Sequence, residues 1–410
     1  MKKHVLIQVR SSSKRLPFKA LLKVNSMPAI IFLYKRLISP SYKCTILTSN
    51  DKSDDFLCSE LKRYRVNFYR GSLSDVKKRF LVFTRNFKDN DIIVRLTADN
   101  LFVDKNLVNK IISQLLKRKK EYLYTNPLSS KIPIGISAEA FKLKKLRKFK
   151  KNSHLDKEHV TINFERNKIN TVEFDYIDSC WKNLNCTLDK LSDFYKIKTT
   201  LESVKQPIKK RWEFLCNKLI KFSKKKFFLD NKKIIIKSFY TKDLKKNLLI
   251  KIAKLKKHEW KYNINSQLNY LKRNLKMTDI HNLLFINNKL VGYTALKKSF
   301  FYKNNDSNNR KFSCLIFDTF IIHKKFRGYN LGEILMYFNK NKIINLGLPA
   351  FLLSKEKHKK YYLKNNWSYL SKKVAIIMNK NHSFKIFSYN LINNNMIKIL
   401  NNTSKIYINF

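Results

Sequence analysis

Three cationic side chains follow the first apolar run of the chain, residues 4–9, and an aspartate follows a later one. The cations are Arg10, Arg15 and Lys19, and the acid is Asp99. Ligands bind beyond the carboxyl ends of the strands in an open α/β sheet, so we expect these side chains to share one edge. A carboxylate opposite a cationic loop suits Mg²⁺-assisted nucleotidyl transfer. The metal bridges phosphate oxygens there, while the cations stabilise the departing pyrophosphate.

The loop that carries these cations contains no glycine, which phosphate-binding loops often use. Instead it holds three small residues, Ser11, Ser12 and Ser13, whose backbone can approach a phosphate closely. Glycine is required where φ is positive and not for anion binding as such. We therefore expect the serines to line the phosphates while the flanking cations supply the charge.

A second group of candidate residues lies in the carboxyl-terminal half. A long apolar run, residues 314–322, precedes a loop that contains Arg327, Gly328 and Gly332. If a helix follows, its first N–H groups can attract an anion, although a plain strand–loop–helix turn explains the same string. Asp318 lies inside the apolar run, where a carboxylate is costly unless it has a partner or a function.

The elements that must position these residues alternate between strand and helix in the first half. This alternation predicts an α/β fold with a largely parallel sheet and helices on both faces. The expected strands are residues 4–9, 43–48, 65–69, 91–97 and 170–174. The expected helices are residues 28–37, 54–64, 74–87, 106–117 and 191–221.

The second half shows a different order of elements, and no internal repeat links the halves. We place the domain boundary near residues 222–231. The expected elements are a strand at 233–239, a helix at 241–257, a hairpin at 281–293 turning at Asn287-Asn288, a strand at 314–322, and a short loop and helix at 324–344. A basic run at 141–151 is interpreted as the solvated face of an amphipathic helix, because Leu143, Leu146 and Phe149 recur at helical spacing.

The charge balance is extreme, with 87 Lys and Arg against 29 Asp and Glu, a formal net charge of +58 over 410 residues. Such a chain could bind a polyanion, because Lys and Arg neutralise phosphates. The basic residues are dispersed, however, and Lys, Asn, Ile and Phe are all abundant, which favours a coding bias. We expect no nucleic-acid partner, and anionic small molecules suit the same surface. The length itself predicts two domains.

The six cysteines show no Cys-x-x-Cys pair and no metal-type spacing. This usage is typical of free thiols in a reducing cytoplasm. The first apolar run is too short for a signal-peptide core, and no run approaches the roughly 20 residues of a membrane span. We therefore expect a cytoplasmic protein without a membrane partner.

Five ordered segments of the first half carry a family resemblance. They are residues 7–19, which read Ile-Gln-Val-Arg-Ser-Ser-Ser-Lys-Arg-Leu-Pro-Phe-Lys, and residues 70–80, 94–99, 158–161 and 187–193. Together they resemble the cytidylyltransferases, in particular the spore-coat-polysaccharide branch, which is related to the CMP-sialic acid synthetases. The resemblance covers about residues 3–205. It implies a Rossmann-like nucleotidyltransferase (GT-A-like) domain over residues 1–222.

The resemblance also implies a reaction and roles for individual residues. CMP would pass from the substrate CTP to a sugar hydroxyl, with release of pyrophosphate. Arg10, Arg15 and Lys19 would hold the triphosphate, Arg10 and Lys19 acting in catalysis, and Asp99 and Asp189 would ligate Mg²⁺. The site or its immediate support would include Arg70, Asp75, Arg79 and His159. Asp193 is better interpreted as a helix cap. Family members usually carry glycine where Phe18 stands and often an acid where Ser137 stands.

The second half resembles another family through its apolar strand, its Arg-Gly loop and helix, and the later segments 351–354 and 360–367. These features are similar to the GNAT superfamily of N-acetyltransferases, which implies an α+β domain over residues 232–400. The family's loop wraps the pyrophosphate of acetyl-CoA, a substrate. The matching residues here are Arg327, Gly328, Asn330, Leu331 and Gly332.

One of these matches replaces a usual glycine, because the family loop carries glycine where Asn330 stands. Asparagine is the other residue that best tolerates positive φ, so the turn can survive. Tyr362 matches the acid that protonates the leaving thiolate, with an aromatic core residue as the alternative interpretation. Asp318 is the leading candidate for the base or for binding the amine.

Three hypotheses follow from these resemblances. The first is a bifunctional enzyme of surface-glycan precursor synthesis, which activates an acidic or amino sugar with CMP and acetylates an amino sugar. The second is a basic nucleic-acid-associated protein that uses these folds for binding. The third is a chain with only one catalytically active domain. Homodimer formation is left open.

Overall fold

A computed structural model describes residues 1–126, 131–148, 157–223, 228–230, 232–303, 311–370, 375–377, 385–389 and 406–409. The chain is a mixed α/β protein that divides into two compact units, Met1–Lys232 and Lys233–Phe410. None of the helices within the described residues has the length and apolar character needed to cross a membrane.

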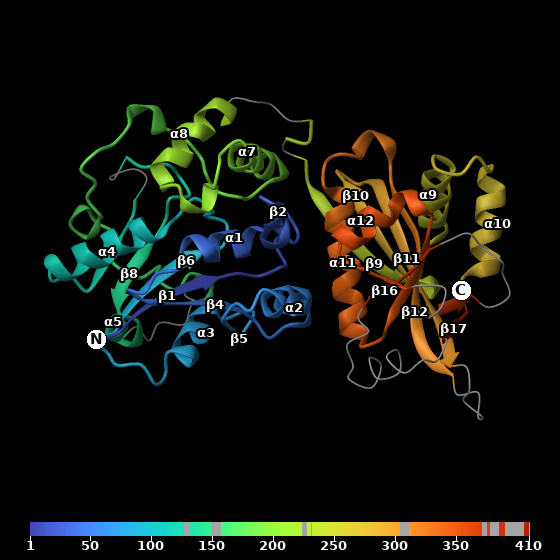
Figure 1. Cartoon of the computed structure of the whole chain (residues 1–410), viewed down its shortest axis with the longest axis horizontal. Coiled ribbons are helices and arrows are strands. Elements are labelled where there is room, and N and C mark those ends of the chain that lie inside the picture. Colours follow the sequence, from blue (N-terminus) through green and yellow to red (C-terminus); the bar gives the residue numbers. More distant parts are fainter. Residues whose placement is uncertain are drawn as a thin grey trace. The chain divides into compact units, whose positions relative to one another are not determined.

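The first unit is built on a six-stranded sheet (Figure 1). In sheet order its strands are β5 (Phe68–Gly71), β4 (Lys43–Ser49), β1 (Lys3–Gln8), β6 (Ile92–Thr97), β8 (Glu139–Lys142) and β7 (Tyr122–Tyr124). The first four strands are parallel, and the last two add an antiparallel pair at one edge. The largely parallel sheet expected from the sequence is therefore confirmed. A separate short ribbon joins β2 (Lys23–Val24) to β3 (Met27–Pro28).

Helices cover both faces of this sheet, as the alternating pattern predicts. They are α1 (Ala29–Arg36), α2 (Asp55–Arg63), α3 (Val76–Phe83), α4 (Lys105–Lys117), α5 (Leu143–Lys148), α7 (Leu191–Glu202) and α8 (Trp212–Ser223). Leu6 of β1 and Ile93 of β6 share a buried cluster with Phe80 of α3 and Leu146 of α5. Because side chains alternate along a strand, Ile7 faces the opposite side. Figure 1 shows α1 on that side.

The strand register brings the candidate residues of the first unit to one edge. Gln8, the last residue of β1, lies opposite Leu47 of β4 and Thr97 of β6. Beyond that point, the Val9 amide donates to the Leu47 carbonyl and the Ala98 amide donates to the Gln8 carbonyl. The loops that carry Arg10 and Asp99 therefore leave the sheet side by side.

The second unit contains a nine-stranded sheet, seven strands of which follow one path. Along that path they are β14 (Ser368–Leu370), β16 (Lys385–Tyr389), β13 (Ala350–Ser354), β12 (Phe312–Ile322), β11 (Lys289–Lys303), β10 (Ile280–Ile286) and β9 (Ile234–Tyr240). β17 (Ile406–Ile408) pairs with β11 and with β15 (Ala375–Ile377). β12 and β13 are parallel, but only Leu315 and Ile316 of β12 pair across them. The two strands therefore separate toward the end of β12.

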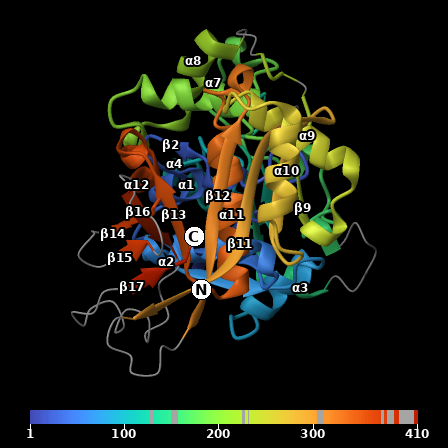
Figure 2. The ribbon, with the colours of Figure 1, turned by 90° about the vertical axis from the view of Figure 1, so that its right-hand side faces the viewer.

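Two pairs of helices cover the two faces of this second sheet (Figure 2). They are α9 (Lys246–Lys257) and α10 (Ile264–Asn274) on one face, and α11 (Leu331–Leu346) and α12 (Lys359–Lys364) on the other. Tyr293 of β11 packs toward α9 and α10. Leu296, three residues further along the same strand, points to the opposite face and packs toward α11 and α12.

Short 3₁₀ helices complete the described structure. They are η1 (Lys19–Leu21), η2 (Lys52–Asp54), η3 (Lys168–Asn170), η4 (Ser179–Trp181), η5 (Pro207–Lys209), η6 (Thr241–Asp243), η7 (Lys324–Phe326) and η8 (Glu356–His358).

Three expected elements differ from the structure. The strand expected at 170–174 is reduced to one bridge between Thr171 and Tyr124. The Val172 amide donates to the Tyr124 carbonyl, but the following amide, that of Glu173, donates to the Gln114 side chain and ends the pairing. The single helix expected at 191–221 is broken where Gln206, at φ 54°, precedes Pro207, whose ring removes a helical N–H donor. The helix expected at 241–257 begins only with α9, after the 3₁₀ turn η6, whereas the short loop and helix expected at 324–344 are present as η7 and α11.

Two further comparisons concern the segments near residue 145 and residue 290. The basic amphipathic helix expected at 141–151 is present as α5, while Phe149 lies outside the described residues. The hairpin turn is where it was expected, with Asn287 and Asn288 at φ 45° and 66°. Both asparagines thus adopt the positive φ that a two-residue hairpin turn requires.

Candidate active sites

The ammonium group of Lys19 lies between two carboxylates at the carboxyl edge of the first sheet. Its Nζ atom is 2.7 Å from Asp99 Oδ2 and 3.0 Å from Asp189 Oδ1. All three side chains are largely buried, with between 14% and 21% of each exposed. The structure therefore brings together three predicted site residues that are up to 170 positions apart in the sequence.

Phe18 positions Lys19 at the start of η1. It adopts the left-handed conformation at φ 57°, and its amide donates to the Ser11 carbonyl at 3.0 Å. A left-handed backbone favours glycine, which explains physically why glycine suits this position. The Phe18 side chain is 5% exposed, so it packs into the protein interior.

The second carboxylate, Asp189, is positioned by a cap and by a loop contact. Asp193 accepts the amides of Asp189 and Lys190 at 3.1 and 2.8 Å, which confirms its interpretation as a helix cap. The Leu188 amide donates to the Asp99 carbonyl at 2.9 Å and so ties the two acidic segments together. Gly135 lies against this segment at φ 96°, where a Cβ atom would be 2.7 Å from the Thr187 amide nitrogen.

Arg10 and Arg15 are the exposed cations of the loop. Arg15 Nη2 lies 2.8 Å from Asp189 Oδ1, and Arg10 Nη2 lies 3.0 Å from Glu158 Oε1. The Arg10 side chain is 45% exposed and the Arg15 side chain is 62% exposed. Ion pairs this exposed contribute little to stability, so both arginines can change partners at low cost when an anion binds.

Asp54 anchors the loop and was not predicted from the sequence. Its Oδ1 atom accepts the Ser11 amide at 2.6 Å, and its Oδ2 atom accepts both the Thr48 hydroxyl and the Ser49 amide. The residue is fully buried. The Ser11 amide therefore already has an acceptor in Asp54, and the expected approach of the serine backbone to the phosphates stays a prediction.

Three residues expected in the site or its support hold the neighbouring loops in place. Arg70 donates to the carbonyls of Ser49 and Asp51 and pairs with Asp55 at 2.7 Å. Arg79 is buried and donates twice to the Ser72 carbonyl, and Asp75 caps α3. His159 is exposed. The structure thus gives the first three residues supporting contacts around the site.

The donor set around Lys19 fits a metal that arrives with its substrate. The described residues contain no group of three or more His, Cys, Asp or Glu side chains that could hold a metal ion. Mg²⁺ commonly binds to only one or two carboxylates, with substrate phosphates and water completing its octahedron. Asp99 and Asp189 can supply that pair. Burial raises the pKa of Asp99, but the Lys19 ammonium and its hydrogen bond outweigh this effect and hold it below the ordinary value.

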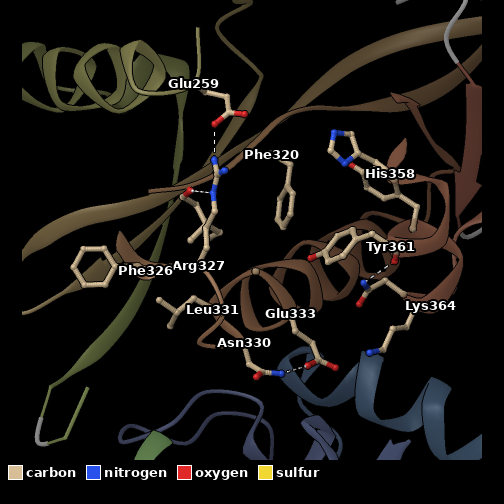
Figure 3. A pocket seen from close by; sticks show the side chains of 15 residues that line it. Glu259, Phe320, Phe326, Arg327, Asn330, Leu331, Glu333, His358, Tyr361 and Lys364 are labelled. Carbon is tan, nitrogen blue, oxygen red and sulfur yellow. Dashed lines mark hydrogen bonds and ion pairs between the residues drawn. The ribbon is translucent and has the colours of Figure 1, made fainter. Parts of the chain in front are cut away.

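The second unit contains a cavity of about 520 Å³ where β12 separates from β13 (Figure 3). Phe320 and Ile322 of β12, the start of α11, and Tyr361 and Tyr362 of α12 line it. All five predicted loop residues, namely Arg327, Gly328, Asn330, Leu331 and Gly332, are among its lining residues. The structure therefore assembles the predicted loop around one cavity.

The loop turns as the sequence predicts. Asn330 adopts φ 51° immediately before α11, so the asparagine takes the left-handed conformation in place of glycine. Arg327 donates from Nε to the Ile322 carbonyl at 2.9 Å and forms an ion pair with Glu259. The α11 N-terminus thus opens into the cavity with its first N–H groups available to an anion.

Two adjacent tyrosines are candidates for the acid that protonates the leaving thiolate, the role expected of Tyr362. The Tyr362 ring packs with Trp367 and Phe387 in a buried cluster, and burial raises its pKa to about 12. The buried hydroxyl of Tyr361 has no hydrogen-bond partner among the residues the structure describes. Figure 3 shows this hydroxyl directed into the cavity beside Phe320. Tyr361 is thus a second candidate donor that the sequence did not single out.

Asp318, the predicted base, already has a cationic partner. Its Oδ2 atom lies 2.6 Å from Lys297 Nζ on the neighbouring strand. A substrate amine that used Asp318 would have to displace this ammonium group. Lys256 of α9 is buried nearby against the ring of Tyr270, and burial lowers its pKa to about 8 despite the opposing charge of Asp318.

Comparison with known proteins adds two curated relatives. An uncharacterized protein of Methanocaldococcus jannaschii is 34% identical over 160 residues, which cover 38% of this chain and 64% of that protein. The spore coat polysaccharide biosynthesis protein SpsF of Bacillus subtilis is 29% identical over 166 residues, or 38% of this chain and 67% of that protein. The chain thus spans only about two thirds of the length of each of these relatives.

Two solved structures are also similar. A cytidylyltransferase from Leptospira borgpetersenii is 24% identical, covering 56% of this chain and 99% of that one, with a TM-score of 0.49. An acetyltransferase of the GNAT family from Staphylococcus aureus is 12% identical, covering 38% and 99%, with a TM-score of 0.29. A family model described as cytidylyltransferase matches residues 4–234, which is more than half of the chain. The chain therefore belongs to the cytidylyltransferase family.

Proposed function

We propose that the first unit transfers CMP from CTP to a hydroxyl group of an acidic or amino sugar, in the synthesis of a surface glycan. The sugar oxygen attacks the α-phosphorus of CTP, and the bond from that phosphorus to the bridging oxygen of the β-phosphate breaks. Pyrophosphate leaves with the electron pair, and the hydroxyl proton passes to solvent. The printed name of the Bacillus subtilis relative, a spore coat polysaccharide biosynthesis protein, supports the choice of a glycan pathway.

The observation that carries this proposal is the cluster of Lys19, Asp99 and Asp189 beside two exposed arginines. Arg10 and Arg15 bind the β- and γ-phosphates and stabilise the charge that develops on the leaving pyrophosphate. Lys19 binds the triphosphate from the buried side. Mg²⁺, held by the two carboxylates, supplies further neutralisation of phosphate charge when bound.

The test is pyrophosphate release from CTP in the presence of Mg²⁺ and a panel of nonulosonic, hexuronic and amino sugars. We expect release with at least one sugar and a preference for CTP over ATP, GTP and UTP. Lys19→Met should abolish release, while Lys205→Met, an exposed lysine away from the edge, should not. No release with any sugar would contradict the proposal.

For the second unit, we propose transfer of an acetyl group from acetyl-CoA to an amine of a sugar. The amine nitrogen attacks the thioester carbon and loses a proton to water, and the carbon–sulfur bond breaks. The departing thiolate takes a proton from a tyrosine hydroxyl, which regains one from solvent. The observation that supports this proposal is the cavity at the separation of β12 and β13, which the α11 N-terminus enters.

Calorimetric titration with coenzyme A and release of free thiol from acetyl-CoA test this second activity. We expect coenzyme A to bind, and amino sugars to increase thiol release. Binding of nucleic acid with a steep salt dependence, together with no binding of coenzyme A, would contradict this proposal and favour the nucleic-acid hypothesis.

A further inference from the structure

The cation of Lys19 lies at the point where the two candidate metal ligands converge. One nitrogen atom accounts for contacts to both carboxylates, at 2.7 Å to Asp99 and 3.0 Å to Asp189. The same Asp189 oxygen also accepts Arg15 at 2.8 Å. One oxygen of each carboxylate, Asp99 Oδ2 and Asp189 Oδ1, is therefore already in contact with the protein's own cations.

A free divalent ion has little reason to enter this arrangement. An ion held between the two carboxylates would lie close to the Lys19 ammonium that contacts both of them, and the two positive charges repel each other. The ammonium cannot simply lose its partners, because it is 14% exposed and a buried charge left without a partner is strongly destabilising. Two carboxylates also complete only part of a Mg²⁺ coordination shell.

A nucleoside triphosphate removes both obstacles at once. Its phosphate oxygens offer Lys19 and Arg15 new anionic partners, and the remaining oxygens complete the coordination of the metal. Arg15 is 62% exposed and can turn to the phosphates without crossing the protein interior. The exchange leaves Asp99 and Asp189 free at the moment when the metal arrives with the nucleotide.

We propose that Lys19 is an internal counter-ion which keeps divalent metal out of the Asp99–Asp189 pair until a nucleoside triphosphate binds. Lys19 then moves from the carboxylates to the phosphates, so that metal and nucleotide bind together. This inference rests on the proposed cytidylyltransferase site. It adds an order of binding, and it makes Lys19 responsible for that order.

The test measures metal binding directly, without turnover. Mn²⁺ replaces Mg²⁺, and the electron paramagnetic resonance signal of free Mn²⁺ reports its binding to the full chain, with and without a non-hydrolysable CTP analogue. Because the analogue itself binds Mn²⁺ through its phosphates, the signal is compared with that of the same Mn²⁺ and analogue without protein. For the wild-type protein we expect weak binding of Mn²⁺ alone, and binding at least tenfold tighter with the analogue. For Lys19→Met we expect Mn²⁺ alone to bind at least tenfold tighter than it does to the wild type.

Two further variants make this result specific. The double variant with Lys19→Met and Asp99→Asn should bind Mn²⁺ alone no more tightly than the wild type does. This result would show that the ion bound by Lys19→Met lies at the carboxylate pair. Lys205→Met should bind Mn²⁺ like the wild type. Thermal unfolding of each variant checks that the first unit stays folded at the titration temperature.

The inference is overturned if Lys19→Met binds Mn²⁺ alone no more tightly than the wild type, or if the wild type binds Mn²⁺ equally well without nucleotide. These outcomes are independent of turnover. A protein that releases pyrophosphate but shows either of them would keep the proposed function and lose the counter-ion role. A protein that shows the Mn²⁺ exchange but accepts no sugar would keep the counter-ion role and lose the proposed function.

Discussion

The two units surround largely buried lysines with different groups. At the sheet edge of the first unit, Lys19 and Arg15 contact carboxylates directly. In the second unit, Lys256 lies 4.5 Å from the Tyr270 ring centre and Lys340 lies 4.4 Å from the Tyr389 ring centre. Lys340 also donates to a backbone carbonyl, that of Asn365. The largely buried lysine of the first site thus contacts two carboxylates, whereas these two buried lysines of the second unit contact aromatic rings and a backbone carbonyl.

The supply of acids accounts for this difference. Only seven of the 29 acidic residues lie after residue 232, so carboxylate partners are scarce in the second unit. Rings attract cations by their quadrupole, but they do not neutralise charge as carboxylates do. An anion that binds to the first site must therefore exchange with existing ion pairs. An anion that binds to the second meets the N–H groups at the start of α11, and there Arg327 has a carboxylate partner, Glu259, to exchange.

The largest effect is expected from breaking the ion-pair cluster of the first site. Asp99→Asn removes one of the two carboxylates, and we expect the rate of pyrophosphate release to fall about 10²- to 10³-fold, the usual effect of losing one electrostatic contact at a reacting centre. Steady-state assays with CTP and the accepted sugar measure it. Asp175→Asn, a change at an exposed surface pair, serves as the control. If the rate of pyrophosphate release falls less than about fivefold, the Lys19–Asp99–Asp189 cluster does not lie at the reaction centre.

The anchor of the loop should matter for folding. Asp54→Ala leaves the Ser11 amide and the Thr48 hydroxyl buried without their acceptor, which we expect to lower the free energy of unfolding of the first unit by about 3 kcal/mol. Hydrogen exchange of peptides from β1 and β4 measures this value locally. The neighbouring Asp51 is exposed and caps η2, so Asp51→Ala should cost only about 1 kcal/mol. Equal effects would contradict the anchoring role.

Lys256, a buried lysine of the second unit, should make the free energy of unfolding of that unit depend on pH. Burial lowers the pKa of Lys256 from 10.5 to about 8. Between these two pH values the unfolded chain binds a proton that the folded chain does not, so stability rises with pH. Below about pH 8 the lysine is charged in both states, and the folded state bears the full cost of burying that charge.

Lys256→Met removes this contribution. We expect the variant to be more stable than the wild type at pH 7, by at most about 3 kcal/mol, and the difference to shrink as pH rises toward 10.5. Hydrogen exchange of β10 and β11 peptides reports on the second unit alone. Lys254→Met, on the exposed face of the same helix, should show no such pH dependence. A constant difference across this range would exclude titration of Lys256.

The smallest effect should separate the two tyrosines of the cavity. Tyr361→Phe removes one hydrogen-bond donor, so we expect the dissociation constant of coenzyme A to rise about tenfold. Tyr362→Phe should change it less than threefold, since the Tyr362 ring packs with Trp367 and Phe387. Calorimetric titration measures both. A larger effect for Tyr362→Phe would indicate that Tyr362, the residue expected from the sequence, contacts coenzyme A and Tyr361 does not.

Much of the architecture could be predicted because it depends on local chemistry. Alternating apolar segments determine the largely parallel sheet of the first unit. Asn287, Asn288 and Asn330 adopt positive φ because asparagine tolerates it, and Pro207 breaks a helix because it lacks an N–H group. The break at Pro207 was missed, although the residue itself carried the signal.

The candidate sites depended on contacts that no local pattern specifies. The sequence by itself indicated Lys19, Asp99 and Asp189 as site residues, but only the fold shows that one ammonium lies between both carboxylates. Asp54 looks like an ordinary residue at a helix start, and its burial under the loop follows from the packing of β1 beside β4. Tyr361 and Tyr362 are adjacent in the sequence, and the cavity alone distinguishes them, because a helix turns successive side chains by about 100°.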